Sequence, residues 1–305
     1  MTTYHKGGRK APFTLSHDAK EKTQMLGIID VGGGLRGAFT AGIYDYLLDQ
    51  GVQPFDYCLG VSAGSANLIP YLAGQRGRNL RFYTQYAFRK EYMSVGHLVK
   101  TGSYIDLDYI YTTLSGPDGE DPVDQAAFNA SPARYEVVVT DAATGEPVYY
   151  DKSMMAGGNF DAIKASCAVP GACKPYPVLG RPGFDGGVAD PVPYRRALEM
   201  GCDRIVVLLT RPAHYRRPLL EHREALETAL HDWPNAYSAL LRRSVRYNLD
   251  VANLKELEKA GKVLLVAPSD ISGMSTLTRD REAILRLYQM GYDQGPKVLE
   301  FTAKS

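Results

Sequence analysis

The sequence predicts an α/β protein in which helices cover a parallel sheet, and three features lead to this prediction. Short apolar runs alternate with stretches of helical spacing over residues 25–73, in the order strand, glycine loop, helix, strand, glycine turn, helix. The chain has 305 residues, 45% of them apolar, which is enough for a large buried core. Glycine accounts for 30 residues, a surplus over the average share of about 7%. This surplus indicates either linker or backbone that must approach a neighbour closely.

The first elements follow from local pattern alone. The apolar run Met25–Val31 predicts a buried strand that ends at three glycines. Residues 35–48 carry apolar side chains at helical spacing, and Gly51 is a plausible helix stop. Residues 55–59 predict a second strand, and residues 60–74 predict a sharp turn followed by a helix.

Later segments extend the same pattern. Four further strands are expected at residues 135–141, 147–150, 204–210 and 262–268. Long helical patterns cover residues 219–260, with a break near Trp233–Pro234, and residues 279–301; residues 76–130 are mixed and predict short helices. We divide the chain into a polar N-terminal arm (1–24), a main domain (25–210) and a C-terminal extension packed on that domain (211–305).

Charge and composition exclude several classes of protein. The 35 Lys and Arg residues nearly balance the 34 Asp and Glu residues, so we expect no nucleic-acid partner. The sequence shows no signal-peptide pattern and no apolar run long enough to span a bilayer, which predicts a soluble cytoplasmic protein; peripheral contact with a membrane stays open. Scattered histidines and four cysteines without a CxxC pair predict buried free thiols and no metal site.

The strongest local signal is the G-x-S-x-G arrangement at residues 60–64, centred on Ser62. A strand that turns abruptly into a helix strains the residue at its apex, and the residues two before and two after it, Gly60 and Gly64, must be small. Such a turn exposes a serine hydroxyl at a helix N-terminus, where developing negative charge is favoured. A glycine turn with a capping serine is the alternative for this motif on its own.

A second signal is the loop Gly32–Gly37, which reads GGGLRG after the first strand. Consecutive glycines leave backbone N–H groups unshielded, which makes a cradle for an anion. A pyrophosphate is one candidate, since the string fits G-x-G-x-x-G, but a dinucleotide site needs an acidic residue after the second strand, where Ser62 stands instead. The oxyanion of an acyl-transfer intermediate is therefore the favoured occupant.

The serine needs a base, and two candidates stand in the sequence. Asp185 precedes Gly186 and Gly187, although an isolated DGG is more often an ordinary turn. His214 would complete the order Ser, Asp, His found in α/β-hydrolases. Against His214, the serine turn follows only the second strand, and the histidine lies in a basic, proline-flanked stretch.

Taken together, GGGLRG, GVSAG and DGG in this order resemble the patatin-like phospholipase family, over roughly residues 25–210. The segment ASCAVP at residues 165–170 is similar to the A-S-x-A-x-P segment of that family, and residues 247–268 look like its bacterial-type members. Val31 departs from the acidic or small polar residue that many relatives carry there, but it touches only the flank of the loop.

The resemblance implies a three-layer α/β/α sandwich with a mostly parallel sheet. It implies a dyad of Ser62 as nucleophile and Asp185 as base, without a catalytic histidine, metal or cofactor. The amides of Gly33 and Gly34, with their neighbours Gly32 and Leu35, would form the oxyanion hole. The remaining motif glycines are Gly37, Gly60, Gly64, Gly186 and Gly187. The implied reaction is hydrolysis of a lipid carboxylic ester through an acyl-enzyme, and we expect Asp185 to lie buried and far from any cation, with a raised pKa.

Three further groups of residues have two interpretations each. Arg36 would hold a lipid phosphate or only orient the glycine loop. Seven of the 21 tyrosines fall between Tyr71 and Tyr111, which suits the rim or lid of an acyl groove or ordinary packing. The three arginines Arg242, Arg243 and Arg246 would touch anionic headgroups or line a solvated helix face. A non-catalytic lipid-binding protein on the same fold is the alternative function, and the presence of both Ser62 and Asp185 speaks against it.

Overall fold

Residues 24–303 are described by the structure, a computed structural model, and their strands form one eight-stranded sheet. The strand order is β5-β6-β3-β2-β1-β7-β8, and β4 pairs with β3 beside this path. The strands β3, β2, β1, β7 and β8 run parallel to one another, whereas β4 and β6 pair antiparallel with β3, and β5 pairs antiparallel with β6. The strands are β1 (Leu26–Asp30), β2 (Tyr57–Val61), β3 (Arg134–Asp141), β4 (Pro147–Asp151), β5 (Tyr176–Val178), β6 (Arg181–Asp185), β7 (Arg204–Leu208) and β8 (Val263–Val266).

Helices fill the connections between these strands. The α-helices are α1 (Ala38–Asp49), α2 (Ala63–Leu72), α3 (Arg78–Thr84), α4 (Val95–Thr101), α5 (Gln125–Ala130), α6 (Asp161–Cys167), α7 (Tyr194–Glu199), α8 (Arg223–Ala229), α9 (Pro234–Lys259) and α10 (Arg281–Thr302). Short 3₁₀ or π turns occupy Gly34–Gly37, Tyr86–Phe88, Tyr109–Leu114 and Lys152–Gly158. No helix in residues 24–303 is long and apolar enough to cross a membrane.

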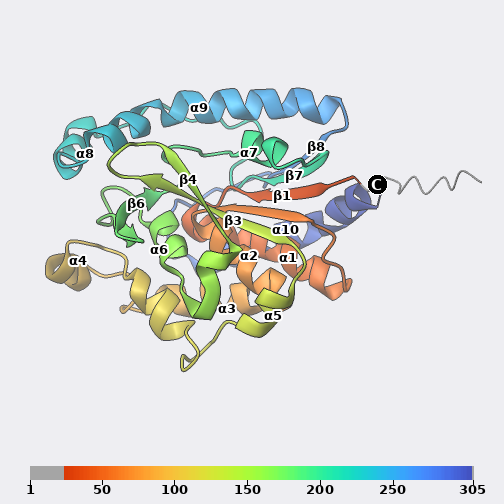
Figure 1. Cartoon of the computed structure of the whole chain (residues 1–305), viewed down its shortest axis with the longest axis horizontal. Coiled ribbons are helices and arrows are strands. Elements are labelled where there is room, and N and C mark those ends of the chain that lie inside the picture. The colour runs from red at the N-terminus through yellow and green to blue at the C-terminus, as the bar shows by residue number, and fades with distance from the viewer. Residues whose placement is uncertain (1–23, 304–305) are drawn as a thin grey trace, which may run out of the picture.

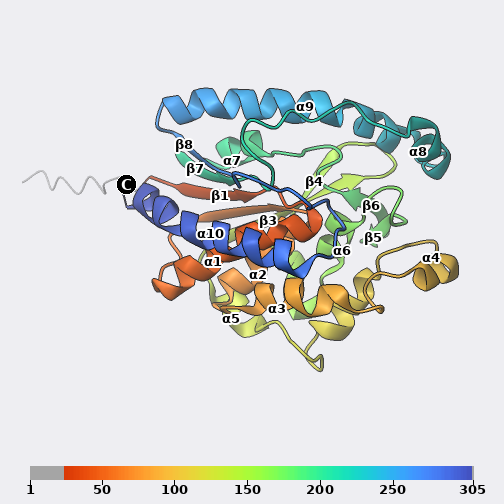
Figure 2. The ribbon, with the colours of Figure 1, turned by 180° about the vertical axis from the view of Figure 1, so that it is seen from behind.

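The helices lie in two layers, one on each face of the sheet. Figure 1 and Figure 2 show α7 and α9 on one side of the strands and α1, α2 and α10 on the other. Successive side chains of β1 and β2 enter opposite cores: Ile28 and Cys58 pack with α1 and α10, whereas Ile29 and Leu59 pack with α7 and α9. This alternation is what two covered faces require, and the predicted three-layer sandwich is confirmed.

Two of the departures from the predicted elements lie next to the predicted site residues Ser62 and Asp185. β2 ends at Val61, two residues later than expected, because Gly60 and Val61 pair with Asp30 and Val138. The strands β5 and β6 were not predicted, because Pro182 and Gly183 make this stretch resemble a loop. The cysteines Cys58, Cys167, Cys173 and Cys202 are free, as expected, and the predicted N-terminal arm lies almost entirely outside the described residues.

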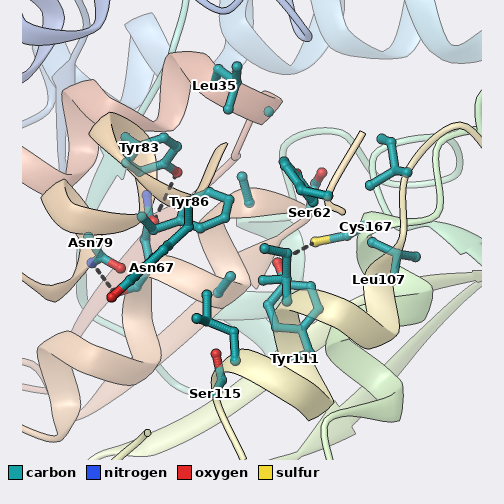
Figure 3. Close-up of a pocket in the computed structure, with 18 of the residues that line it drawn as sticks. Leu35, Ser62, Asn67, Asn79, Tyr83, Tyr86, Leu107, Tyr111, Ser115 and Cys167 are labelled. Carbon is teal, nitrogen blue, oxygen red and sulfur yellow. Dashed lines mark hydrogen bonds between the residues drawn. The ribbon is translucent and has the colours of Figure 1, made fainter. Parts of the chain in front are cut away.

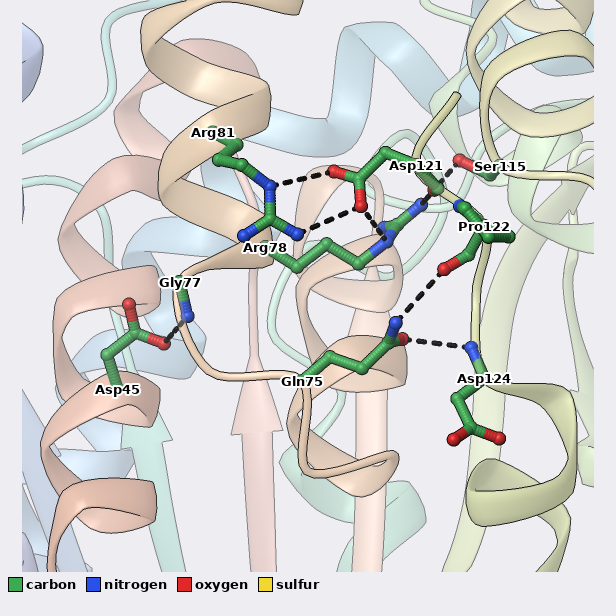
Figure 4. A network of polar contacts seen from close by, with 9 residues as sticks. All are labelled: Asp45, Gln75, Gly77, Arg78, Arg81, Ser115, Asp121, Pro122 and Asp124. Carbon is green, nitrogen blue, oxygen red and sulfur yellow. Dashed lines mark hydrogen bonds and ion pairs between the residues drawn. The ribbon is translucent and has the colours of Figure 1, made fainter. Parts of the chain in front are cut away.

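A buried ionic network fastens residues 115–124 to α3 (Figure 4). Arg81 binds both carboxylate oxygens of Asp121, at 2.9 and 3.2 Å. Arg78 donates to Ser115 Oγ at 2.8 Å and to the main-chain oxygen of Asp121. The side chains of Arg78 and Asp121 are each only 10% exposed. The Gln75 side chain donates to the carbonyl of Pro122 and accepts from the N–H of Asp124. The loop is therefore held at its start by Arg78 and at its end by Gln75.

We expect Asp121→Asn to lower the free energy of unfolding by about 3 kcal/mol, because it leaves two arginines without their buried counter-charge. Urea unfolding of the variant and of wild type measures this difference. Asp118→Asn, an exposed carboxylate in the same loop, is the matched control and should change stability little. Equal losses in both variants would contradict a specific role for the network.

Candidate active site

The strand register brings three predicted site segments to one edge of the sheet. Asp30, the last residue of β1, pairs with Gly60 in β2, so the glycine loop and Ser62 follow neighbouring parallel strands. On the other side of β2, Val61 pairs with Val138 of β3. The next residue of β3, Val139, pairs with Asp185 at the end of β6. Ser62 and Asp185 therefore flank the same point of β3.

Ser62 sits at a strained strand-to-helix turn, as the motif predicts. Its φ of 54° and ψ of −132° lie in a region that side chains other than glycine rarely adopt. A Cβ on Gly60 would collide with the α2 backbone at Ser65, and a Cβ on Gly64 would collide with Asp30. The predicted need for small residues at both positions is thus confirmed.

The main chain of Ser62 is fully hydrogen-bonded, and this anchors the turn. Its N–H donates to Ser166 Oγ at 2.8 Å, and that hydroxyl donates to the Val138 carbonyl at 2.6 Å. Its carbonyl accepts from the N–H of Ser65 at 2.9 Å and from the Ser65 hydroxyl at 2.6 Å. Ser166, in the segment ASCAVP, is therefore the residue that ties the serine turn to β3.

The glycine loop has two free amide donors. Gly32, Gly33 and Gly34 all have positive φ, with 137° at Gly33, so the loop needs glycine. The N–H of Gly32 donates to Asp30 Oδ1 at 2.9 Å, and that of Leu35 donates to the Thr276 carbonyl at 2.9 Å. Within residues 24–303, the N–H groups of Gly33 and Gly34 have no partner. Of the four amides named from the sequence, these two are available to a ligand.

Asp30 anchors the start of this loop by accepting the hydrogen bond from Gly32, a role that was not predicted from the sequence. It is fully buried, and it also accepts from the Tyr44 hydroxyl at 3.2 Å. Burial raises its pKa to about 6, against the lowering influence of its hydrogen bonds from Thr40, Gly32 and Tyr44. The available signal was an acidic residue at the end of an otherwise apolar strand, directly before the glycines.

Asp185 is the last residue of β6 and is only 5% exposed. Its Oδ1 accepts from the N–H of Gly187 at 2.8 Å, which fixes the carboxylate over the turn. The expectation that no cation lies nearby is wrong. A Cβ on Gly187 would lie 3.0 Å from Arg243 Nη2 and 3.1 Å from Asp185 Oδ1, so the missing side chain admits the guanidinium beside the carboxylate. Arg243 and Asp185 interact electrostatically without forming an ion pair.

Two hollows meet at Ser62. The first is mostly apolar (Figure 3). Its lining includes Phe82, Tyr83, Tyr86, Tyr92, Leu107, Ile110, Tyr111 and Leu114. The second is polar and is lined by the glycine loop, Asp185, Arg36, Arg211, Arg217 and Arg243. The residues that line both hollows are Gly34, Ser62, Val169 and Thr276, so the serine hydroxyl is placed between an apolar and a cationic surface.

A cysteine lies directly against the serine. The Ser62 side chain is close enough to Cys167 to favour its thiolate form, and the Cys167 sulfur lies 3.3 Å from the Tyr111 hydroxyl. Burial raises the pKa of Cys167 to about 12, so it is a neutral thiol at physiological pH. Figure 3 shows Tyr111, Cys167 and Ser62 following one another along the pocket wall.

The other histidine, tyrosine and arginine side chains named from the sequence differ in whether they reach the two hollows. His214 is exposed, and no histidine of residues 24–303 lines either hollow. Of the seven tyrosines, Tyr83, Tyr86, Tyr92 and Tyr111 line the apolar hollow. The three arginines of α9 differ: Arg242 is exposed, Arg246 pairs with Asp190 at 3.2 Å, and Arg243 lines the polar hollow. Arg211 and Arg217 were missed, because their basic, proline-flanked stretch resembles a solvated loop.

Comparison with known proteins gives two family matches. The model of the patatin-like phospholipase family matches residues 31–198. A domain of unknown function, DUF6363, matches residues 233–303.

Individual relatives share only part of their length and about a third of the aligned residues with this chain. YjjU of Escherichia coli, an uncharacterised protein, is 28% identical over 212 residues, which cover 68% of this chain and 59% of YjjU. An uncharacterised NTE family protein of Mycobacterium tuberculosis is 37% identical over 73 residues, which cover 24% of this chain and 19% of the relative. The chain thus matches less than two thirds of the length of both relatives. The crystal structure of VipD from Legionella pneumophila has a TM-score of 0.47 and 15% identity, covering 91% of this chain and 67% of VipD.

The raised pKa of Asp30 predicts a pH dependence of stability. Between about pH 4 and pH 6 the folded state keeps the proton that the unfolded state has lost, so stability falls as the pH rises through this window. The decline amounts to about 3 kcal/mol and is complete above pH 6. Asp30→Asn cannot titrate, so the difference in unfolding free energy between wild type and variant should change by this amount from pH 4 to pH 7. Parallel urea-unfolding curves across that range would contradict the assignment.

Proposed function

Because the chain belongs to the patatin-like phospholipase family, we propose that it is a serine acyl hydrolase that cleaves carboxylic esters of lipids. In this proposal Ser62 is the nucleophile, Asp185 is the base, and the N–H groups of Gly33 and Gly34 form the oxyanion hole. The observation that carries it is the position of Ser62: its hydroxyl lies at the junction of an apolar hollow and a loop with two unused amide donors.

The proposed reaction proceeds in two steps. Asp185 takes the proton of the Ser62 hydroxyl while its oxygen attacks the acyl carbon, and the glycine amides hold the negative charge on the former carbonyl oxygen. The ester C–O bond then breaks, and the leaving alcohol takes the proton from Asp185. In the second step water attacks the acyl-enzyme, Asp185 accepts one of its protons, and Ser62 regains a proton as the fatty acid leaves. The chain's own residues suffice for this chemistry, so the proposal needs no metal or cofactor.

The surroundings of the serine support a lipid substrate. The apolar hollow offers aromatic and aliphatic side chains to an acyl chain. Its back wall is rigid, because Asn67 donates to the Gly37 carbonyl at 3.0 Å and accepts from the Tyr83 hydroxyl at 3.0 Å (Figure 3). The same two hydrogen bonds connect the end of the glycine loop to α2 and α3. The exposure of His214 favours the dyad over a triad that contains this histidine.

We expect Ser62→Ala to abolish labelling by a fluorophosphonate probe and to lower hydrolysis of p-nitrophenyl esters by at least about a thousandfold. Asp185→Asn should lower kcat by at least about a hundredfold, because it removes the base. His214→Ala is the matched control and should retain the wild-type rate.

Labelling that survives Ser62→Ala would remove Ser62 from the proposed role. If His214→Ala lost activity while Asp185→Asn kept it, a triad mechanism would replace the dyad. A folded wild-type protein that neither reacts with the probe nor cleaves any ester would instead favour the non-catalytic lipid-binding alternative.

Chain-length selectivity tests the role of the apolar hollow. Ala66 lines it one helical turn after Ser62. Ala66→Phe should fill the space next to the serine, so that several methylene groups of a long acyl chain can no longer be buried there. We expect kcat/KM for p-nitrophenyl palmitate to fall by at least about tenfold relative to p-nitrophenyl acetate. An unchanged ratio of the two substrates would show that the acyl chain lies elsewhere.

A further inference from the structure

Four arginines from three distant segments surround the polar hollow. Arg36 belongs to the glycine loop, Arg211 and Arg217 follow β7, and Arg243 lies on α9. Arg36 is only 4% exposed, and its Nη2 would lie 2.9 Å from a Cβ on Gly33. Burial, together with the positive charges of the neighbouring arginines, lowers the pKa of Arg36 to about 9 and that of Arg217 to about 10.

These four side chains lack the carboxylate partners that several other arginines of this protein have. Within residues 24–303 none of the four forms an ion pair, and the one side-chain hydrogen bond among them joins Arg36 to Thr276 Oγ1 at 3.3 Å. The Nε atoms of Arg36, Arg211 and Arg243 are buried without a partner. Elsewhere the pairs are Arg78 and Arg81 with Asp121, Arg195 with Asp250, Arg196 with Glu136, and Arg246 with Asp190. Burying unpaired like charges together is costly, and a bound anion would offset that cost.

The cluster is held in place by uncharged contacts. Asn248 of α9 accepts from the N–H of Arg217 at 2.8 Å and donates to its carbonyl at 2.9 Å. The guanidinium of Arg211 lies over the ring of Tyr215 at 4.3 Å, and that ring meets Tyr247 edge-on. Arg217 is thus held through its backbone and Arg211 through an aromatic ring, which leaves the N–H groups of both guanidinium groups free for a ligand.

We propose that Arg211, Arg217 and Arg243, with Arg36, form a subsite for the phosphate group of the lipid substrate whose ester carbonyl lies at Ser62. The proposal rests on the function proposed above and deepens it by naming the substrate class: lipids that carry a phosphate close to the scissile ester. Such a molecule would place its acyl chain in the apolar hollow and its phosphate in the cationic one, with the ester at the serine between them.

The proposal also gives a role to residues 233–303, which match a domain of unknown function. This segment contributes Arg243, Tyr247 and Thr276 to the polar hollow. Residues 31–198, matched by the lipase family, contribute the glycine loop, Ser62 and Asp185. Of the four arginines only Arg36 lies in the segment that supplies Ser62 and Asp185, so most of the headgroup site would come from the chain beyond residue 198.

Binding is measured by calorimetry on the Ser62→Ala protein, so that no lipid is consumed. The probes are oleoyl lysophosphatidic acid, oleoyl glycerol with the same acyl chain, and inorganic phosphate. We expect the phosphate-bearing lipid to bind at least about tenfold more tightly than oleoyl glycerol, with a preference that weakens at high salt. Adding Arg243→Gln should remove most of this preference, and Arg242→Gln, one residue away on the exposed side of α9, should retain it.

Two further readouts separate a binding role from a structural one. The unfolding midpoint of Arg243→Gln should equal or exceed that of wild type, because the variant loses no hydrogen bond and removes the cost of burying a charge, which exceeds its attraction to Asp185. In the active protein, which keeps Ser62, we divide kcat/KM for oleoyl lysophosphatidic acid by kcat/KM for oleoyl glycerol. This ratio should fall at least about tenfold in Arg243→Gln and stay constant in Arg242→Gln. If Arg243→Gln does not fold, Arg217→Gln takes its place in each measurement.

Several outcomes would overturn the proposal. Equal affinity for the two lipids would exclude a phosphate subsite, and so would an equal loss of preference in Arg242→Gln. Binding of inorganic phosphate without any preference for the phosphate-bearing lipid would assign the arginines to a free anion instead of a headgroup. If the wild-type protein cleaves neither lipid, the proposed function fails, while calorimetry on Ser62→Ala still decides whether the subsite exists.

Discussion

The close contact between the two glycine turns at the ends of β1 and β2 is the constraint on which the site depends. Side chains at Gly32 or Gly64 would overlap the opposite turn, and the Asp30 carboxylate fills the space between them. Since both turns are locked against this buried group, Ser62 keeps its strained conformation, and the free amides keep their position relative to it. The donors are therefore oriented before any ester arrives, which is what stabilisation of developing charge requires.

The segments that the sequence predicts well are those whose structure is local. The first two strands and helices follow from apolar spacing and glycine positions, and the packing at Gly60 and Gly64 agrees with the motif. β6 was missed because its pairing partner β3 lies far back in the chain, and Pro182 hides the strand pattern. For the same reason the sequence could indicate Asp185 as a candidate base but not the strand that positions it.

The surroundings of the dyad could not be predicted, because they depend on convergence of distant segments. Nothing in the sequence says that Arg36, Arg217 and Arg243 share one hollow, and each basic stretch by itself resembles a solvated surface. The expected isolation of Asp185 failed for this reason: the cation beside it comes from a helix that begins almost 50 residues later along the chain (α9, Pro234–Lys259). Clusters of charged side chains from distant segments become visible only when the folded structure is known.

The wall that α9 contributes to the polar hollow has a consequence for how such proteins diversify. The strained turn tolerates almost no substitution, because glycine is required on both sides of Ser62. Arg243, in contrast, lies on a long regular helix, a backbone conformation that does not require one particular residue at this position. If the arginines bind the headgroup, then substitutions at Arg211, Arg217 and Arg243, which all lie beyond residue 198, would change the lipid preference while the hydrolytic centre within residues 31–198 stays unchanged.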